Sequence, residues 1–490
     1  MYFSVSPKGM KALEQTAIDK GISAEILMEN AAKACQEFLK DYYIKHISNP
    51  KILLVCGTGN NGGDGLALAR LLSKENIDSY VYLTGEPKTP ESQKNLERLK
   101  ETDVKILEDF SSIDGIFDLV VDAVFGTGFH GEPKGNAAEA IEKINNIGVP
   151  VVSIDIPSGV DGFTGKTEGL FVRATNTISI GVPKHGIYLN SDGAAGEITR
   201  VDIGLENPIV NATGGNIDFV PVMQAGDLKM HLPYRKPYGH KGDFGKVLLY
   251  AGSFGMAGAA IVAAQAAVKS GAGITYIMCD KKTARILQVA VPNAICTKKA
   301  PQDIDVLALG CGIKENKKSQ LTIFDLFNKD IPSIWDAGAL NLLAKNPAKL
   351  GKNAIITPHI GEAARLLNKS RKEISDNMFA AVKELHDKYG CNVMLKGVST
   401  VMYDGHNYAL QPGRIPALAK GGSGDALVGI LAAICAQQEV FAPMVAMQTA
   451  IMWLNAAGRY ETKIQGEYSP TSLDVVNSLG KALVARNNWL

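Results

Sequence analysis

Short apolar runs alternate with helical patterns along almost the whole chain, and this alternation restricts the possible folds more than any other feature. It is typical of α/β proteins built on parallel sheets. Many runs, such as KILLV and VVSI, carry apolar residues on both faces, as expected for strands that are covered by helices on both sides. The chain has 490 residues, too many for one ordinary core. We therefore expect an α/β protein with two or three domains.

Two groups of strands are separated by a segment of different composition. The first group ends with EITRVDIG and the second begins with GKVLLYAG. Residues 205–226 between them contain Pro, Asn and Gly and show little helical periodicity. We predict a boundary in this segment, with domains at residues 1–213 and 225–490. In residues 391–413, short runs separated by Gly-containing turns predict antiparallel strands at an edge of the second sheet.

Composition restricts the partners and the location of the protein. A formal net charge of +1 gives no electrostatic reason to expect nucleic acid or an anionic membrane. The most apolar helical patterns, AGAAIVAAQAAV and ALVGILAAICA, are shorter than the roughly 18 apolar residues that a membrane span needs. The seven cysteines form no C-x-x-C pair and lie mostly in apolar runs, as expected for reduced, buried thiols. We expect a cytoplasmic protein that binds neither membrane nor nucleic acid.

A glycine-rich loop, GTGNNGGDG at residues 57–65, follows the first predicted strand. It fits G-x-G-x-x-G, the pattern that binds a dinucleotide pyrophosphate in dehydrogenases. A dehydrogenase also needs a ribose-binding acid about 20 residues further on, and Glu86 is the candidate. Asp64 argues against a dehydrogenase, because its charge would repel a pyrophosphate. A second match, from Gly126 to Gly131, shows how easily the pattern arises in a chain with 50 glycines.

Polar side chains at the ends of three neighbouring strands suggest a cation site. Asn61, Asp122 and Ser158 supply the oxygen atoms that hard cations prefer. Each alone is explained as an ordinary turn residue, but three such loops together favour a site. Asp155, at the end of VVSIDI, would be partly buried, and a buried carboxyl group can have a raised pKa suited to acid–base catalysis. Its alternative role is to cap a neighbouring loop.

The strongest single motif is KGGSGDALVG at residues 420–429. Its small residues let backbone N–H groups surround an anion at the start of a helix. Asp425 would lie beside a transferring phosphoryl group and could accept a hydroxyl proton, as the base of a kinase does. The alternative is a simple helix cap. LKGVST at residues 395–400 could hold a nucleotide through backbone groups and Lys396, whereas a single histidine, His359, is not by itself evidence of catalysis.

Taken in order, these motifs resemble one family. ILMENAA, GNNGGDG, DAVFGTG and DIPSG are similar to the NAD(P)H-hydrate epimerase domain, which implies a Rossmann-like three-layer fold. HKGDFGKVLLYAGSFGMAGAA, SGAG, TPHIGE, LKGVST and KGGSGD are similar to the ADP-dependent NAD(P)H-hydrate dehydratase domain, which implies a ribokinase-like α/β fold. Over nearly its whole length the chain thus resembles the bacterial bifunctional NAD(P)H-hydrate repair enzymes.

The resemblance implies two reactions. The first domain would interconvert the R and S epimers of the 6-hydrated dinucleotides NADHX and NADPHX. The second would phosphorylate the 6-hydroxyl of the S epimer with ADP and eliminate phosphate, which yields NAD(P)H, AMP and inorganic phosphate. The implied metal ions are potassium (K+) in the epimerase and magnesium (Mg2+) in the dehydratase. We also expect a homo-oligomer.

The resemblance also assigns roles to residues of this chain. Asp155 and Asp425 would be the catalytic groups of the two domains. In the epimerase, the hydrated dinucleotide would contact Asn60, Asn61, Gly62, Gly63, Asp64, Gly126, Thr127, Gly128, Phe129, His130, Gly131, Glu132 and Asp155. Potassium would be held by Asn61, Asp122 and Ser158. In the dehydratase, the hydrate would contact Ala259, Gly312, His359 and Asp425, and the nucleotide would contact Lys396, Gly397, Val398, Ser399, Thr400 and Gly424.

One departure and two alternative functions accompany the resemblance. Gly338 in WDAGAL stands where a second aspartate is expected, although Asp336 is retained. A ribokinase-like kinase for a small alcohol, with an accessory dinucleotide-binding domain, would use the same KGGSGD loop, but the epimerase-like loops argue against it. A non-catalytic dinucleotide-binding or scaffold protein would tolerate the loss of either catalytic carboxylate.

Overall fold

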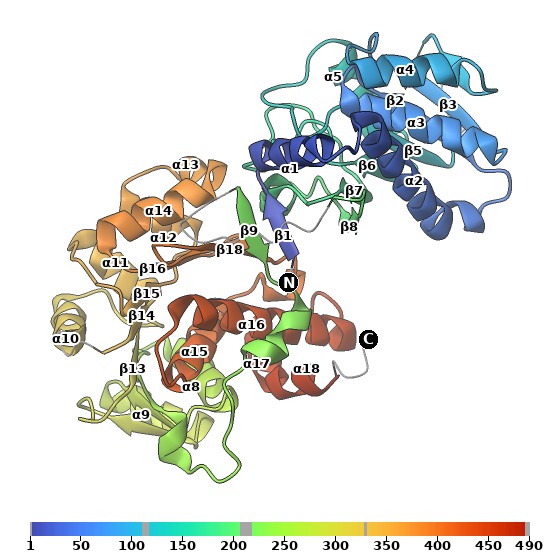
Figure 1. The fold of residues 1–490 in the computed structure, drawn as a ribbon. Helices are drawn as coiled ribbons and strands as arrows, with labels where there is room; N and C mark the ends of the chain where they lie inside the picture. Colours follow the sequence, from blue (N-terminus) through green and yellow to red (C-terminus); the bar gives the residue numbers. More distant parts are fainter. Residues whose placement is uncertain (1, 110–116, 206–217, 328–330, 486–490) are drawn as a thin grey trace. The chain divides into compact units, whose positions relative to one another are not determined.

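The computed structural model describes residues 2–109, 117–205, 218–327 and 331–485 and divides into two compact units (Figure 1). The first unit lies within residues 3–220, and the second contains the chain from residue 221 onward. Each has a sheet composed mainly of parallel strands, so the predicted α/β class is confirmed. The predicted boundary segment, residues 205–226, falls partly outside the described residues. Its described part contains a strand, β9 (Phe219–Val222), which its composition did not predict.

The first unit has seven parallel strands in the order β4-β3-β2-β5-β6-β7-β8. The chain extends the sheet from β2 first through β3 and then, in the other direction, through β5. Ligands of open α/β sheets bind at the carboxyl ends of the strands where this reversal occurs. In chain order, the elements before residue 205 are β1 (Tyr2–Val5), α1 (Pro7–Asp19), α2 (Ala24–Tyr42), β2 (Lys51–Cys56), α3 (Asn60–Lys74), β3 (Asp78–Leu83), α4 (Pro90–Leu99), β4 (Lys105–Leu107), β5 (Leu119–Ala123), α5 (Asn136–Asn146), β6 (Val151–Ile154), β7 (Asn176–Ile180), α6 (His185–Leu189) and β8 (Glu197–Val201).

Helices cover both faces of this sheet. Ile52 and Leu54 of β2 belong to a core that includes buried residues of α2 and α3. Leu53 and Val55, on the other side of the same strand, pack in a core with Ile141 of α5. Burial on both faces explains why the central strands are apolar at successive positions, and it confirms the predicted three layers.

The larger sheet has eleven strands in the order β1-β9-β18-β17-β16-β15-β14-β13-β10-β11-β12. Strands β16, β17 and β18 are antiparallel, as predicted. Their placement at an edge was wrong, because β9 pairs with β18 on its far side. The strand β12 was also not predicted. The strands from residue 246 onward are β10 (Lys246–Tyr250), β11 (Ile274–Met278), β12 (Ala294–Thr297), β13 (Val306–Leu309), β14 (Ser333–Trp335), β15 (Ala354–Ile356), β16 (Asn392–Leu395), β17 (Ser399–Tyr403) and β18 (Tyr408–Pro412).

Helices also lie on both sides of the parallel part of the larger sheet (Figure 1). On one side, Val247 and Leu249 pack in a core with α8, α15 and α16, and every residue of α15 from Ala426 to Cys435 is buried. On the other, Trp335 meets Phe327 of α10 edge to face, with ring centroids 5.5 Å apart. The helices are α7 (Leu228–His231), α8 (Ala257–Lys269), α9 (Lys281–Ala290), α10 (Lys317–Phe327), α11 (Ala337–Lys345), α12 (Ile360–Leu367), α13 (Arg371–Asp376), α14 (Met378–Tyr389), α15 (Ser423–Ala436), α16 (Pro443–Gln465), α17 (Ser472–Asn477) and α18 (Leu479–Ala485).

The order of these strands also reverses, between β10 and β13. The loops that follow β10 and β13 therefore mark the expected ligand position of the second unit. Among the helices of the described residues, none combines the length and the hydropathy that crossing a membrane requires.

Candidate active sites

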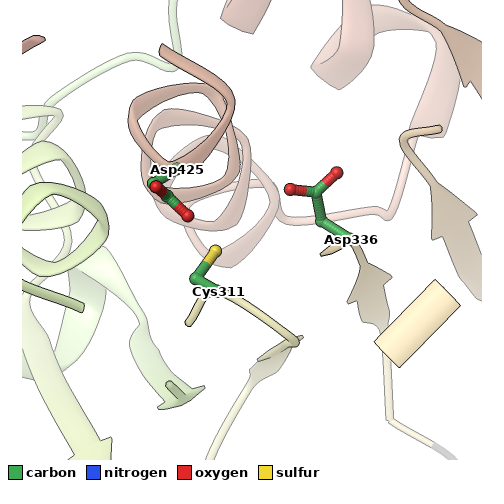
Figure 2. A group of neighbouring side chains, drawn as sticks. All are labelled: Cys311, Asp336 and Asp425. Carbon is green, nitrogen blue, oxygen red and sulfur yellow. The ribbon is translucent and has the colours of Figure 1, made fainter. Parts of the chain in front are cut away.

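Asp425, in the first turn of α15, faces Cys311 and Asp336 (Figure 2). One ligand-type atom of each of these three residues lies within 4.8 Å of the other two. Cys311 follows β13 and Asp336 follows β14, so the cluster lies at the predicted edge of the sheet. Burial raises the pKa of Asp425 to about 6; the Cys311 thiol and Lys396 act to lower it, while Asp336 acts to raise it. A carboxyl group with this pKa can accept a proton near neutral pH.

Lys396 connects this cluster with the neighbouring pocket. Its Nζ lies 2.7 Å from Asp336 Oδ1, and the hydroxyl of Thr357 donates a hydrogen bond to the same oxygen over 2.8 Å. Burial acts to lower the pKa of Lys396, but Asp336 and Glu362 outweigh it and the pKa is raised. The ammonium group is therefore charged. A Cβ added at Gly424 would lie 3.4 Å from Lys396 Nζ, which places the start of α15 against this charge.

A pocket of about 710 Å³ adjoins Lys396, within the range of small-molecule sites. It is lined by most of the predicted nucleotide-binding residues, namely Lys396, Gly397, Val398, Thr400 and Gly424, and by His359. Ser399, also predicted, is buried and does not line it. The sequence prediction missed the opposite wall, whose residues include Arg414, Ile415, Leu418, Leu454 and Asn455. The apolar residues between Gly413 and Lys420 were the available signal, but they have no regular spacing.

Ala259 and Gly312, two of the residues predicted to contact the hydrate, lie together next to the cluster of Asp425, Cys311 and Asp336. A Cβ added at Gly312 would lie 2.8 Å from the Cβ of Ala259, and Gly312 directly follows Cys311. His359 instead has a structural role in part: its Nδ1 accepts a hydrogen bond from the Gly361 N–H over 3.0 Å and caps α12. Burial lowers the pKa of His359, and the nearby Lys396 contributes to this.

The departure at Gly338 and the lysine of the KGGSGD motif both have structural explanations. A Cβ at Gly338 would lie 2.6 Å from Cγ1 of Ile313, so an aspartate does not fit there without a shift of its neighbours. The Lys420 ammonium donates hydrogen bonds to the carbonyl oxygens of Tyr468 and Pro470. It therefore holds the segment before α17.

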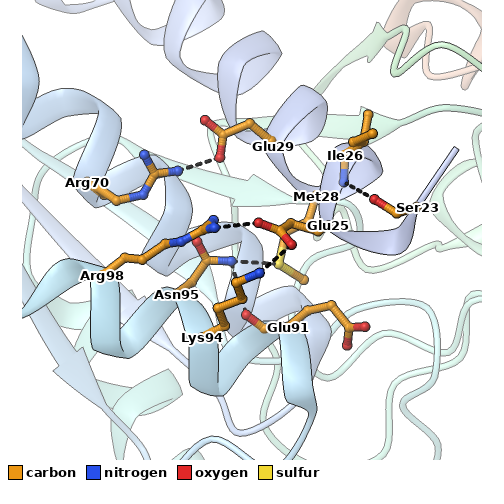
Figure 3. A network of polar contacts seen from close by, with 10 residues as sticks. All are labelled: Ser23, Glu25, Ile26, Met28, Glu29, Arg70, Glu91, Lys94, Asn95 and Arg98. Carbon is orange, nitrogen blue, oxygen red and sulfur yellow. Dashed lines mark hydrogen bonds and ion pairs between the residues drawn. The ribbon is translucent and has the colours of Figure 1, made fainter.

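In the first unit, helices α2, α3 and α4 are joined by ion pairs (Figure 3). Glu25 of α2 lies 2.6 Å from Lys94 and 2.5 Å from Arg98, both in α4. Lys94 and Arg98 lower the pKa of Glu25. Glu29 of α2 pairs with Arg70 of α3, which is only 7% exposed. These pairs link α2 to α4 and to α3, the helix whose first turn carries part of the glycine-rich loop.

The turn from β2 into the start of α3 approaches other backbone so closely that only glycine fits at two positions. A Cβ on Gly57 would lie 1.9 Å from the carbonyl oxygen of Val124, and one on Gly62 would lie 1.9 Å from the carbonyl oxygen of Gly57. This packing brings Asn61 to the loop that follows β5, where its Nδ2 donates to the carbonyl oxygen of Phe125 over 2.9 Å.

The structure brings the three predicted cation ligands together around Phe125. The Ser158 hydroxyl lies 3.3 Å from the Phe125 carbonyl oxygen and 2.5 Å from Asp122 Oδ1. Asp122 is fully buried, and no cationic side chain of the described residues pairs with it. Burial raises its pKa, although hydrogen bonds, chiefly from Ser158, act to lower it. Asn61 Oδ1 is buried and accepts no hydrogen bond. A buried, unsatisfied oxygen beside an unpaired carboxylate suits a hard cation.

Asp155 follows β6 with a left-handed backbone, at φ 69°. Its Oδ2 accepts hydrogen bonds from the backbone N–H and the hydroxyl of Thr127, over 3.1 and 2.5 Å. Asp155 therefore also caps the loop after β5, which is the alternative role considered from the sequence. Its Oδ1 lies 2.5 Å from Nζ of Lys184, a residue that the sequence prediction missed. The available signal was a charged residue in GVPKHG, directly after an apolar strand.

Two further carboxyl groups share this environment. Glu14 of α1 and Asp64 of α3 both have raised pKa values, with burial as the main cause. The charge of Asp155 adds to the effect in both, while Lys184 opposes it. Glu14 and Asp64 thus retain protons at a pH where exposed carboxyl groups have lost theirs, and Asp64 is compatible with a substrate loop.

The other predicted epimerase residues lie in the same two loops. Phe129 stacks on Phe125 with ring centroids 4.3 Å apart, and His130 Nδ1 lies 2.6 Å from Asp161 Oδ2. A Cβ at Gly126 would lie 3.1 Å from the Cβ of Asn61, so this glycine adjoins the cation ligands. Of the rest, Asn60, Gly62 and Gly63 belong to the first turn of α3, and Gly128, Gly131 and Glu132 lie in the exposed part of the loop after β5.

Comparisons with known proteins identify both halves. A family model described as "YjeF-related protein N-terminus" matches residues 24–186, and one described as "NAD(P)H-hydrate dehydratase" matches residues 247–477. The bifunctional NAD(P)H-hydrate repair enzyme Nnr of Coxiella burnetii is 32% identical over 441 residues, which are 88% of this chain and 89% of the relative.

Two solved structures resemble the second half. An ADP/ATP-dependent NAD(P)H-hydrate dehydratase from Bacillus subtilis, co-crystallised with ATP and Mg2+, is 27% identical with a TM-score of 0.50 and covers 54% of this chain and 98% of its own. A ribokinase-like superfamily protein from Enterococcus faecalis, 22% identical with a TM-score of 0.50 over 57% of this chain and 98% of its own, shares the fold. The chain belongs to the family of bifunctional NAD(P)H-hydrate repair enzymes, with an epimerase half followed by a ribokinase-like dehydratase half.

Proposed function

We propose that residues 1–213 epimerise NADHX and NADPHX and that residues 225–490 dehydrate the S epimers with ADP. One observation carries the proposal: each unit has a carboxyl group shielded from solvent, the buried Asp155 or the partly buried Asp425, beside the strand ends where its sheet order reverses. Two such sites in one chain favour two successive reactions on one substrate over a small-alcohol kinase with an accessory domain.

In the epimerase, Asp155 carries out the proton transfer that allows the configuration at carbon 6 to invert. This carbon of the hydrated ring carries the hydroxyl and is bonded to the ring nitrogen. Once Asp155 has accepted the proton of this hydroxyl, the bond from carbon 6 to the ring nitrogen can break to give an aldehyde; the nitrogen takes up that proton, and the ring can close again on either face of the carbonyl. Oδ2 of Asp155 already accepts two hydrogen bonds, whereas Oδ1 accepts one and has a free lone pair. The proposed proton transfer takes place at Oδ1.

The other predicted residues would hold the dinucleotide near Asp155. The set is Asn60, Asn61, Gly62, Gly63, Asp64 and Gly126 to Glu132. Potassium would be bound by Asn61, Asp122 and Ser158, which the unsatisfied Asn61 Oδ1 and the unpaired Asp122 support. The bound ion supplies positive charge that compensates Asp122. The same residues would then hold the loop after β5, through Phe125, against the start of α3.

In the dehydratase, the nucleotide occupies the pocket beside Lys396, and the hydrate lies near Ala259, Gly312, His359 and Asp425. Asp425 accepts the proton of the 6-hydroxyl as the oxygen takes the terminal phosphoryl group. Phosphate then leaves carbon 6 more readily than hydroxide would, and loss of a proton from carbon 5 forms the ring double bond of NAD(P)H. Asp336 and Asp425 offer the oxygen ligands that magnesium prefers, and the bound ion supplies charge that neutralises the phosphates. The Cys311 thiol is a poor ligand for magnesium.

We further propose that the enzyme is a cytoplasmic homo-oligomer. All seven cysteines are free thiols, and five of them are buried. Such cysteine usage suits a reducing compartment.

The decisive experiment uses mixed R and S epimers of NADHX and follows the absorbance of NADH. With ADP, the unmodified enzyme should convert both epimers completely. Asp155→Asn should convert only the S fraction rapidly, and Asp425→Asn should form no NADH. The exposed residues Asp41 and Asp325 provide matched controls, because Asp→Asn there should leave both phases unchanged. Absence of NADH formation with either ADP or ATP would exclude the proposed function.

A further inference from the structure

Lys184 is buried to a degree that is rare for lysine: only 1% of its surface is exposed. It directly follows the turn after β7 and precedes α6. Its Nζ lies 2.5 Å from Asp155 Oδ1 and donates to the carbonyl oxygen of Ile180 over 2.9 Å. A buried charge of this kind is costly unless it is paired and hydrogen-bonded. Both requirements are met here by groups at the carboxyl edge of the sheet.

Lys184 and Thr127 contact different oxygens of the Asp155 carboxylate. Thr127 donates two hydrogen bonds to Oδ2, and Lys184 approaches Oδ1 alone. Together they fix the rotation of the carboxylate. Oδ1 is the oxygen with a free lone pair for a substrate hydroxyl, and a group bound there would also lie beside the lysine ammonium.

We propose that Lys184 is a positioning residue of the epimerase, which pairs with the carboxylate of Asp155 and presents its Oδ1 to the 6-hydroxyl. This inference rests on the proposed epimerase function. Lys184 acts on the reaction through Asp155 and completes a site whose other residues lie in the loops after β2, β5 and β6.

The charged neighbours explain why such a lysine is needed. Glu14 from α1 and Asp64 from α3 both interact with Asp155, and like charges favour protonation of one another. Among the described residues, Lys184 is the cation that pairs with Asp155, whereas Lys11 acts on Glu14. His185, next in the chain, bonds to the Ser4 hydroxyl over 2.8 Å. Without Lys184, three neighbouring carboxyl groups would compete for protons in a buried site.

The test measures interconversion of pure R-NADHX and S-NADHX by chromatography without nucleotide, so that only epimerisation occurs. Lys184→Met and Lys184→Gln remove the charge, while Lys184→Arg retains it. In both neutral variants, the acidic limb of the kcat/KM profile should move to higher pH by about one to three units, the effect expected from loss of a neighbouring charge. Lys184→Arg should restore the limb toward its original position. Conversion of S-NADHX with ADP in the same variants reports that the second unit is intact.

The exposed pair of Lys40 and Glu75, 2.7 Å apart, supplies the control. Lys40→Met should leave the pH profile unchanged. A lysine with only a structural role would lower activity equally at every pH, so an unshifted limb in a folded neutral variant would overturn the inference. The pH profile of Lys184→Met or of Lys184→Gln is enough to test the inference, provided that the variant folds. If the unmodified enzyme does not interconvert the epimers, the epimerase assignment itself fails, which is a different result.

Discussion

We expect a single carboxyl group, Asp425, to determine the pH range of the dehydratase reaction. Burial raises the pKa of Asp425 to about 6, so the group is ionised and able to accept a proton only above that pH. We predict that kcat/KM for S-NADHX with ADP is constant well above pH 6 and falls by about tenfold per pH unit below it. The thiol of Cys311 lowers this pKa, so Cys311→Ala should move the limb to higher pH. Cys391→Ala, which alters a buried thiol in another part of the unit, should not. A limb near pH 4 in the unmodified enzyme would show that another group limits the reaction.

The sequence predicted the site residues that lie within recognisable loops. It did not predict the residues from other elements that contact them. Asn61, Asp155 and Asp425 each end a strand or begin a helix in a distinctive motif. Lys184 meets Asp155 only because β6 and β7 are neighbours in the sheet. The wall of the nucleotide pocket around Asn455 likewise comes from a helix far along the chain. Such pairs depend on tertiary packing, which local spacing does not encode.

The turn from β2 into α3 depends on glycine at particular positions. A Cβ at Gly57 would meet a carbonyl oxygen at 1.9 Å, whereas a Cβ at Gly59 meets nothing within 4 Å. Gly59 also has an ordinary φ of −100°. We predict that Gly57→Ala lowers the free energy of unfolding of the first unit by about 3 kcal/mol or more, and that Gly59→Ala changes it by no more than about 1 kcal/mol. Chemical denaturation monitored by circular dichroism compares the two. Equal stabilities would show that the loop can move away from Val124.

At the level of helices and strands, the sequence predicted most of the architecture. Runs such as KILLVC and FDLVVDA are long and apolar, and each became a strand of the first sheet. The strands β9 and β12 were missed because each has only four residues, β9 contains a proline, and β12 ends in Cys296 and Thr297. β9 lies in a segment rich in Pro and Asn, and its pairing with β18 is a long-range contact. Short strands at the margins of a sheet are defined by their partners more than by their composition.

Each of the two units should respond to its own ligand. A ligand that binds only the folded state stabilises it by RT ln(1 + [L]/Kd), which is about 2.7 kcal/mol at a hundredfold excess over Kd. We predict that potassium raises the unfolding temperature of the first unit and that ADP with magnesium raises that of the second. Differential scanning calorimetry in potassium or choline chloride, with and without nucleotide, measures both. Ser158→Ala should abolish the potassium effect while the nucleotide effect persists. A potassium effect that survives this substitution would place the ion elsewhere.

The left-handed backbone at Asp155 determines which variants of this residue can be interpreted. At φ 69°, aspartate, asparagine and glycine are accepted far more readily than alanine. Asp155→Asn therefore removes the charge while the turn after β6 keeps its shape. Asp155→Ala, the usual choice in a scan, would alter the turn and the chemistry together, and the loss it caused would overstate the catalytic share of the carboxylate.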